Sequence, residues 1–320
     1  MSTATLPDSI AARERVAPFV HRTPLLTSRT LDAETGLEVR LKAENFQRTG
    51  SYKIRGPLNK LSLLSDEERA RGVVCSSAGN HAQGVALAAS MLRVRAVVCM
   101  AENATPAKVA ATRAYGAEVV QHGTIWDEAD EMARELVERD GLVYVHPFDD
   151  PDLIAGQGTL GLEILEDWPE VELVVVPIGG GGLISGVATA VKRARPEVRV
   201  VGVESADGPA MKASIDAGER VTLERCDTVI DGLRVKRVGR HTFELVSRFV
   251  DEIVTVPDET IFANVLWLMA RTKLVVEGAA AAPVAALRSR ALAPPPGTKV
   301  ACVLSGGNID LSRLHGLAWN

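Results

Sequence analysis

The sequence predicts an α/β protein of two doubly wound domains, each built on a mostly parallel sheet. Strand-like apolar runs alternate with helix-like stretches almost throughout the 320 residues, and several strand-to-helix turns are rich in glycine or small polar residues. Short strands separated by helices are typical of parallel sheets covered on both faces, and this length suffices for two domains with cores of their own. The expected strands span residues 39–42, 73–76, 96–100, 118–121, 142–146, 172–178, 198–204, 252–256 and 299–304.

Helix-like stretches lie between these strands, at residues 80–91, 106–115, 125–139, 154–165, 183–195 and 259–272. The run from 73 to 145 has the pattern of a compact four-strand unit, and the flanking parts supply a longer second sheet. We therefore expect residues 1–60 and 146–320 to form a large domain, with a small domain at 61–145 inserted in it.

Composition narrows the function classes. Apolar residues make up 46% of the chain and charged residues 24%, as in a soluble globular protein, and the net charge of −5 argues against a nucleic-acid-binding surface. No apolar run is long enough to cross a bilayer, and residues 1–10 lack the features of a signal peptide. The four cysteines lack CxxC spacing, so we interpret them as small buried hydrophobic residues in a reducing compartment, which predicts a cytoplasmic protein.

The most informative turn is a run of four successive glycines: Gly179, Gly180, Gly181 and Gly182. It follows an apolar run and precedes the helix-like stretch 183–195. Without Cβ atoms the backbone N–H groups can turn toward one point, and the helix adds its N-terminal partial positive charge, so the run predicts a phosphate site. The alternative is a turn that only tightens the packing of strand against helix. Neither a P-loop nor a GxGxxG fingerprint is present.

Lys53 is the candidate reactive amine. It opens a probable helix just after Gly50 and lies between Tyr52 and Ile54. Poor solvation beside these residues and the positive end of the helix both lower the pKa of a lysine, which makes the neutral amine available for a Schiff base. The alternative is an exposed lysine on an amphipathic helix.

Two further turns carry small polar residues. The turn at 76–81 suits a carboxylate at a helix N-terminus, although Asn80 is alternatively only an N-cap. The turn at 305–308 follows the last strand and either places a hydroxyl beside a ligand ring or is a plain turn. All four segments lie at the carboxyl ends of strand-like runs, where open α/β sheets bind ligands. A phosphorylated aldehyde cofactor joined to an amino acid would use all four.

These motifs extend over nearly the whole chain, from about residue 21 to residue 314. The segments are 21–25, 41–45, 51–56, 79–84, 146–150, 156–159, 179–182, 272–277 and 305–308. As a set they resemble the fold-type II pyridoxal-phosphate (PLP) enzymes, in particular the threonine/serine dehydratases and serine racemases. The resemblance implies a fold like that of the tryptophan synthase β chain, with PLP bound in the large domain.

By position, the resemblance implies that Lys53 bonds covalently to PLP and later moves the Cα proton, with Tyr52 beside it. Asn80 would hydrogen-bond the 3-oxygen of the cofactor, and Ser305 would face its pyridine nitrogen. The glycine run and the amide of Leu183 would bind the phosphate. The loop for the substrate carboxylate would contain Ser77, Ala78, Gly79 and His81.

The reaction implied is loss of water and then ammonia from a 3-hydroxy amino acid, as in a threonine/serine ammonia-lyase. A serine opposite the ring nitrogen gives a weaker electron sink than an aspartate, which suits prompt elimination. The enzymatic alternatives are a dehydratase for another 3-hydroxy amino acid, of the 3-hydroxyaspartate or hydroxyectoine-breakdown type, a serine racemase and a synthase. A non-catalytic metabolite sensor is the rival from another class, and Lys53 argues against it.

Departures from the family pattern bear on the subtype. Racemases carry an acid/base serine where this chain has Ala78, and an asparagine where it has Phe148, so racemisation is disfavoured. Glu204 is the candidate ligand for a divalent cation (Mg²⁺ or Ca²⁺), with Asp207 as a second carboxylate. The segment after Glu204 is one residue short, however, and Glu204 alternatively only ends a strand.

Feedback-regulated dehydratases continue into a C-terminal regulatory domain, whereas this sequence stops at Asn320. We therefore expect neither that domain nor end-product control through it. The resemblance also implies a homodimer or homotetramer that binds a small amino-acid substrate and neither nucleic acid nor membrane.

Overall fold

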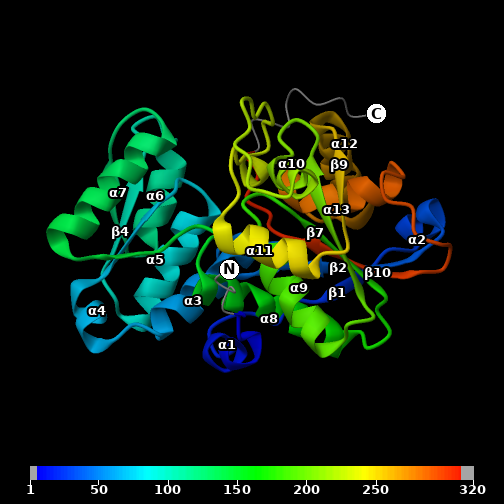
Figure 1. Cartoon of the computed structure of the whole chain (residues 1–320), viewed down its shortest axis with the longest axis horizontal. Helices are drawn as coiled ribbons and strands as arrows, with labels where there is room; N and C mark the ends of the chain where they lie inside the picture. The colour runs from blue at the N-terminus through cyan, green and yellow to red at the C-terminus, as the bar shows by residue number, and fades with distance from the viewer. Residues whose placement is uncertain (1–5, 311–320) are drawn as a thin grey trace.

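The computed structural model describes residues 6–310, which form two sheets flanked by helices (Figure 1). The larger sheet has the strand order β1-β2-β10-β7-β8-β9, and the smaller has β5-β4-β3-β6. Every pairing of these strands is parallel except that of β1 with β2. The predicted α/β fold with mostly parallel sheets is therefore confirmed.

The larger sheet consists of β1 (Leu25–Thr27), β2 (Glu38–Ala43), β7 (Leu173–Pro177), β8 (Arg199–Ser205), β9 (Glu252–Val256) and β10 (Lys299–Leu304). The smaller consists of β3 (Val73–Ser76), β4 (Ala96–Met100), β5 (Glu118–Gln121) and β6 (Val143–Tyr144).

The helices in the first half of the chain are α1 (Ser9–Val16), α2 (Arg29–Thr35), α3 (Arg55–Ser62), α4 (Asp66–Arg71), α5 (Asn80–Leu92), α6 (Pro106–Ala114) and α7 (Trp126–Asp140). Those in the second half are α8 (Pro151–Asp167), α9 (Gly182–Ala194), α10 (Ala210–Ala217), α11 (Arg240–Phe249), α12 (Asp258–Thr272) and α13 (Gly278–Arg288). Short 3₁₀ turns are η1 (Glu44–Phe46), η2 (Arg48–Gly50), η3 (Tyr52–Ile54) and η4 (Asp231–Leu233).

The central strand β7 shows why the larger sheet is buried on both faces. Leu173 and Val175 point into a core shared with α2, α12 and α13, whereas Val174 and Val176 point into a second core shared with α8 and α9. A strand between two helical layers needs apolar residues at every position, which is why its sequence is a continuous apolar run.

The smaller sheet is built in the same way and lies on the left in Figure 1. Its core includes Ile54 of η3, Leu58 of α3 and Leu153 of α8, all outside the residues 61–145 predicted for the small domain. The predicted domain boundaries remain a prediction, and residues 1–5 and 311–320 of the predicted large domain lie outside the described part of the chain.

Two local predictions differ from the structure. Lys53 was expected in the first turn of a helix, but it lies in the 3₁₀ turn η3, and α3 begins only at Arg55. The antiparallel edge strand β1 was not predicted, because three residues are too short for a periodic signal.

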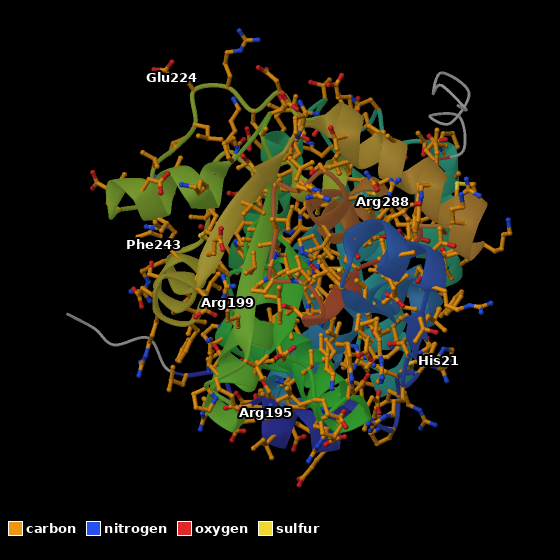
Figure 2. All side chains as sticks on the ribbon, turned by 90° about the vertical axis from the view of Figure 1, so that its right-hand side faces the viewer. His21, Arg195, Arg199, Glu224, Phe243 and Arg288 are labelled. Carbon is orange, nitrogen blue, oxygen red and sulfur yellow. The ribbon has the colours of Figure 1, made fainter. Side chains whose placement is uncertain are left out.

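The surface and the interior follow the composition. Charged side chains such as Arg195 and Glu224 lie at the outer margin of the molecule (Figure 2). All four cysteines are free and buried: Cys75, Cys99, Cys226 and Cys302. Within residues 6–310, no helix combines the length and apolar character that a membrane span requires.

Candidate active site

A pocket opens where β7 and β10 end and the turn η3 approaches them. Its lining comes from segments far apart in the sequence: Tyr52, Lys53, Asn80, Phe148, Pro177, Gly179, Gly180, Gly181, Gly182, Leu183, Gly232, Leu233, Glu277, Ala279 and Ser305. The pocket thus lies at the carboxyl ends of the strands, as expected for an open α/β sheet. All nine residues predicted to bind the cofactor are among those that line it.

Lys53 presents its amine to this pocket. The Nζ atom donates a hydrogen bond of 2.7 Å to the carbonyl oxygen of Pro147. Burial lowers the pKa of Lys53 to about 8, although the nearby carboxylate of Glu277 opposes the shift. The side chain keeps partial exposure through the pocket, but protein atoms crowd it enough to disfavour the charged form. A substantial neutral fraction is therefore present near pH 8.

The backbone of Lys53 is held closely by its neighbours. A Cβ atom on Gly84 of α5 would lie 2.7 Å from the carbonyl oxygen of Lys53, so only glycine permits this approach. The turn is also joined to the end of β10, since the amide of Tyr52 donates to the carbonyl of Ser305 at 3.1 Å and Ser51 forms a β-bridge with Gly306. The backbone of Ser305 is therefore part of the framework around the lysine, and the role of its hydroxyl stays a prediction.

The glycine run forms one wall of the pocket. Gly181 has φ of +92° and is the N-cap of α9, so the unpaired N–H groups of the first helical turn begin at the pocket. A Cβ atom on Gly180 would lie 2.3 Å from the ring of Phe148, and one on Gly179 would lie 2.4 Å from the carbonyl oxygen of Gly232. The glycines permit this close packing against Phe148 and Gly232. They also leave backbone amides at a helix N-terminus, an arrangement that fits a phosphate.

Asn80 is the first residue of α5, and Gly79 is the N-cap, so the interpretation of Asn80 as a cap is wrong. Its Nδ2 atom donates to both carboxylate oxygens of Glu277, at 2.9 and 3.0 Å, and its Oδ1 atom accepts from Nδ2 of Asn308 at 2.8 Å. Burial raises the pKa of Glu277, while Asn80 acts in the opposite direction. The two side chains form a polar wall opposite the glycine run.

The predicted substrate loop borders the pocket without lining it. The hydroxyl of Ser77 accepts a hydrogen bond from the amide of Gly79, and Ala78 packs against the core of the smaller sheet. His81 is 3% exposed, and its Nε2 atom lies 2.9 Å from the carbonyl oxygen of Val145. Burial and the nearby Lys53 lower the pKa of His81 to about 3, so its ring is neutral. The roles of these residues toward a substrate stay predictions.

Glu204 has other partners than a metal. Its carboxylate accepts the backbone N–H groups of Met211 and Lys212, at 2.8 and 2.7 Å, and so satisfies the start of α10. Asp207 accepts from the amide of Asp258 at 3.1 Å. In the part of the chain that the structure describes, no three His, Cys, Asp or Glu side chains are arranged to hold a metal ion.

Several lining residues were not assigned a site role from the sequence. Glu277 and Phe148 fall within motifs of the family resemblance, which placed them near the site without assigning them a role. Gly232 and Leu233 lie in an irregular segment without periodicity, and only the three-dimensional packing brings them to the pocket.

Fold and site together have the features of an α/β enzyme with a poorly solvated lysine beside a helix N-terminus that suits a phosphate-bearing cofactor. Comparison with protein families makes the assignment specific. The chain belongs to the family described as pyridoxal-phosphate-dependent enzymes, whose model matches residues 16–306. PLP fits this pocket because the amides of the glycine run suit its phosphate and the amine of Lys53 suits its aldehyde.

Relatives within the family have related activities. The chain is 51% identical over 310 residues to the L-threonine ammonia-lyase of Thermotoga maritima, covering 97% of this chain and 77% of the relative. The structure of threonine deaminase isoform 2 from Solanum lycopersicum matches with a TM-score of 0.94 and 38% identity over 97% of this chain and 90% of that one. Maize serine racemase matches with a TM-score of 0.93 and 36% identity, over 98% and 96% of the two chains.

Proposed function

We propose that this protein is a threonine/serine ammonia-lyase, which converts a 3-hydroxy amino acid into a 2-oxo acid and ammonia. The relatives that bear this activity support the reaction class. The observation that carries the proposal is the amine of Lys53, whose pKa of about 8 leaves a neutral base beside a cradle for phosphate.

PLP, when bound, supplies the electron sink that acidifies the Cα–H bond of the substrate. The chain contributes the base: Nζ of Lys53 takes the Cα proton, and loss of the Cβ hydroxyl completes the removal of water. Hydrolysis of the resulting enamine then releases ammonia and the 2-oxo acid. Gly179–Gly182 and the amide of Leu183 would hold the phosphate, while Asn80 and Ser305 would orient the ring.

The pocket favours a substrate with an uncharged side chain. Among its lining residues only Lys53 and Glu277 carry ionisable acidic or basic groups apart from the phenol of Tyr52, and none is an arginine. A second substrate carboxylate, as in 3-hydroxyaspartate, would lie near Glu277, and the one basic residue of the lining is Lys53, which the reaction itself uses. Threonine and serine carry no such group.

Serine racemase activity is the second candidate, because the maize enzyme shares the fold closely. Racemisation needs an acid on the face of Cα opposite Lys53. The methyl group of Ala78, at the position where racemases carry serine, delivers no proton. The lyase therefore remains the better supported function.

A substrate panel tests the proposal directly. Purified holoenzyme is supplied with L-threonine, L-serine and 3-hydroxyaspartate, and release of 2-oxo acid is measured together with the chirality of the remaining amino acid. We expect 2-oxo acid from L-threonine and L-serine, with no D-enantiomer. Turnover confined to 3-hydroxyaspartate, or accumulation of D-serine, would contradict it. Homo-oligomeric assembly and a cytoplasmic location belong to the same proposal and are checked by sizing and fractionation.

A further inference from the structure

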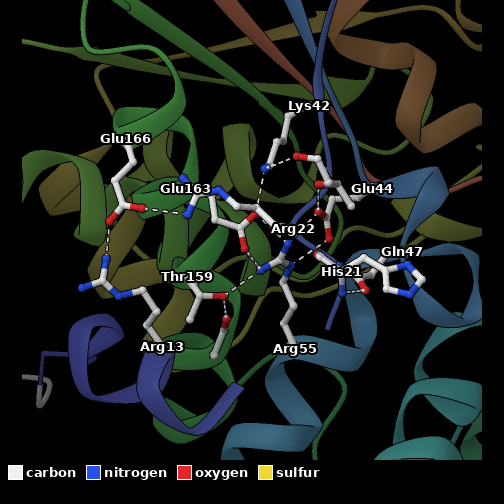
Figure 3. A network of polar contacts seen from close by, with 12 residues as sticks. Arg13, His21, Arg22, Lys42, Glu44, Gln47, Arg55, Thr159, Glu163 and Glu166 are labelled. Atoms are coloured by element: carbon white, nitrogen blue, oxygen red, sulfur yellow. Dashed lines mark hydrogen bonds and ion pairs between the residues drawn. The ribbon is translucent and has the colours of Figure 1, made fainter. Parts of the chain in front are cut away.

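Beneath the turn that carries Lys53 lies a buried ion network (Figure 3). Its members are Thr23, Lys42, Glu44, Arg55, Thr159 and Glu163, and they come from β2, η1, α3, α8 and the segment before β1. The side chains of Arg55, Lys42 and Glu44 are fully buried. Arg55 is two residues from Lys53, at the start of α3.

Arg55 uses all five of its N–H donors. Toward Glu44 it forms a fork, with Nε and Nη2 at 2.8 Å from the two carboxylate oxygens. Toward Glu163 it forms a second fork, with Nη1 at 2.7 Å and Nη2 at 3.0 Å. The remaining donor on Nη1 reaches the hydroxyl of Thr159 at 3.1 Å. Only a planar guanidinium satisfies two carboxylates in this way, and a lysine ammonium does not.

Lys42 completes the charge balance of the network. Its Nζ atom donates to Glu163 and to the carbonyl oxygen of Thr23, both at 2.7 Å. Burial alone would raise the pKa of Glu44, but Arg55 and Lys42 outweigh it and lower the pKa. Two cations thus face two carboxylates inside the protein. Because desolvation offsets most of the attraction in such buried pairs, a well-packed apolar cluster would stabilise the fold as well. The network therefore contributes something other than stability alone.

What the network fixes is the backbone next to the reactive amine. A Cβ atom on Gly156 of α8 would lie 2.5 Å from the carbonyl oxygen of Arg55, just as one on Gly84 of α5 would crowd the carbonyl of Lys53. Residues 53–55 thus lie closely packed between two helices, and the double fork ties this segment to Glu44 and Glu163.

We propose that Arg55 is a positioning residue: anchored by Glu44 and Glu163, it holds the turn η3 so that the amine of Lys53 stays at its place in the pocket. This inference rests on the proposed function, in which Lys53 is the base. Misplacement of a reacting group by about 1 Å reduces rates by up to about 100-fold. Loss of a fork therefore affects the chemistry of Lys53 beyond any change in stability.

The test compares Arg55→Lys and Glu163→Gln with two controls. Leu136→Ala removes apolar volume from the far face of the smaller sheet, between β3 and α7, and Arg22→Gln removes an exposed arginine at the outer edge of the network. Each variant is measured as apoprotein and as holoenzyme. The first readout is the rate at which the apoprotein takes up PLP, followed by its visible band as a function of pH. The second is the separate determination of kcat and KM for L-threonine.

For Arg55→Lys we expect PLP uptake and kcat to fall by about 10- to 100-fold, with KM within about twofold, and the midpoint of the uptake–pH profile to move up from about 8. Leu136→Ala and Arg22→Gln should keep the wild-type midpoint and kcat, whatever stability they lose. Folded Arg55→Lys that behaves like Leu136→Ala would show a merely structural role and overturn the inference.

If Arg55→Lys does not fold, Glu163→Gln decides by the same criterion. It keeps the size of the side chain but removes its charge, and because an amide nitrogen cannot accept a hydrogen bond, it breaks one arm of the fork. Failure of the proposed function looks different. It would appear in the unmodified protein, as absence of PLP on Lys53 in the peptide recovered after borohydride reduction.

Discussion

Two lysines eleven positions apart occupy opposite environments in this molecule. Lys42 is fully buried, with a carboxylate of Glu163 and the carbonyl of Thr23 each at 2.7 Å. Lys53 donates instead to the neutral carbonyl of Pro147, and burial lowers its pKa to about 8. Lys42 is held by an ion pair and serves the structure, whereas the lowered pKa of Lys53 makes its amine available for chemistry.

The largest expected effect is on turnover and comes from Lys53→Ala. Without the base at Cα, kcat should fall by more than about 1,000-fold, and the visible band of bound PLP should disappear while the protein remains folded. Release of 2-oxo acid and the absorption spectrum measure this. Lys236→Ala, at an exposed position, is the control and should behave like wild type. Normal turnover by Lys53→Ala would show that Lys53 is not the base.

Lys42→Met tests whether Lys42 stabilises the fold. It leaves the carboxylate of Glu163 with one cation fewer in the interior, which should lower the free energy of unfolding by about 3–5 kcal/mol. Denaturant unfolding of the apoprotein measures the loss. Arg22→Gln, which breaks a largely exposed ion pair, should change it by less than about 1 kcal/mol. If both variants lose the same free energy of unfolding, the buried charge of Lys42 contributes no more to stability than the exposed charge of Arg22.

The stability of the apoprotein should rise with pH between about 8 and about 10.4, because in this window the unfolded chain holds a proton that folded Lys53 has released. The slope from this one group is at most about 1.4 kcal/mol per pH unit. Unfolding free energies of wild type and Lys53→Met across this range isolate the contribution, and Lys53→Met should lack it. A difference between the two proteins that is independent of pH would argue against the lowered pKa.

A smaller shift is expected from Glu277→Gln. Glu277 raises the pKa of Lys53 against the effect of burial, so its neutral isostere should move the midpoint of PLP uptake below 8, by less than about 1 unit. Glu224→Gln, on the surface, is the matched control. A midpoint that moves upward would mean that Glu277 does not act on Lys53 through its charge.

The sequence was most informative for features that a single short segment determines by itself, such as a strand or a turn. The strands at 73–76, 96–100 and 299–304 agree with the structure to the residue, because buried parallel strands are unbroken apolar runs between turns. The glycine run and Lys53 were recognisable for a similar reason: the backbone freedom and the amine belong to single positions.

Features made by distant residues were not predictable from one sequence. Glu277 meets Asn80 across 197 positions, and Arg55 meets Glu163 across 108. No local periodicity records such pairs, since they arise where the start of α5 meets the N-cap of α13 and where α3 packs against α8. The 3₁₀ turn at Lys53 likewise depends on the close approach of Gly84, which propensity alone does not reveal.

The position of β10 between β2 and β7 has a consequence for biosynthesis. This strand is the last one of the described chain, yet it fills the centre of the larger sheet and carries Ser305 to the pocket. Until β10 has been synthesised, β2 and β7 each have an unpaired apolar edge, and the pocket for PLP is incomplete. A stop codon between residues 257 and 298 removes this strand alone from the larger sheet and should therefore yield aggregates rather than a partly active polypeptide.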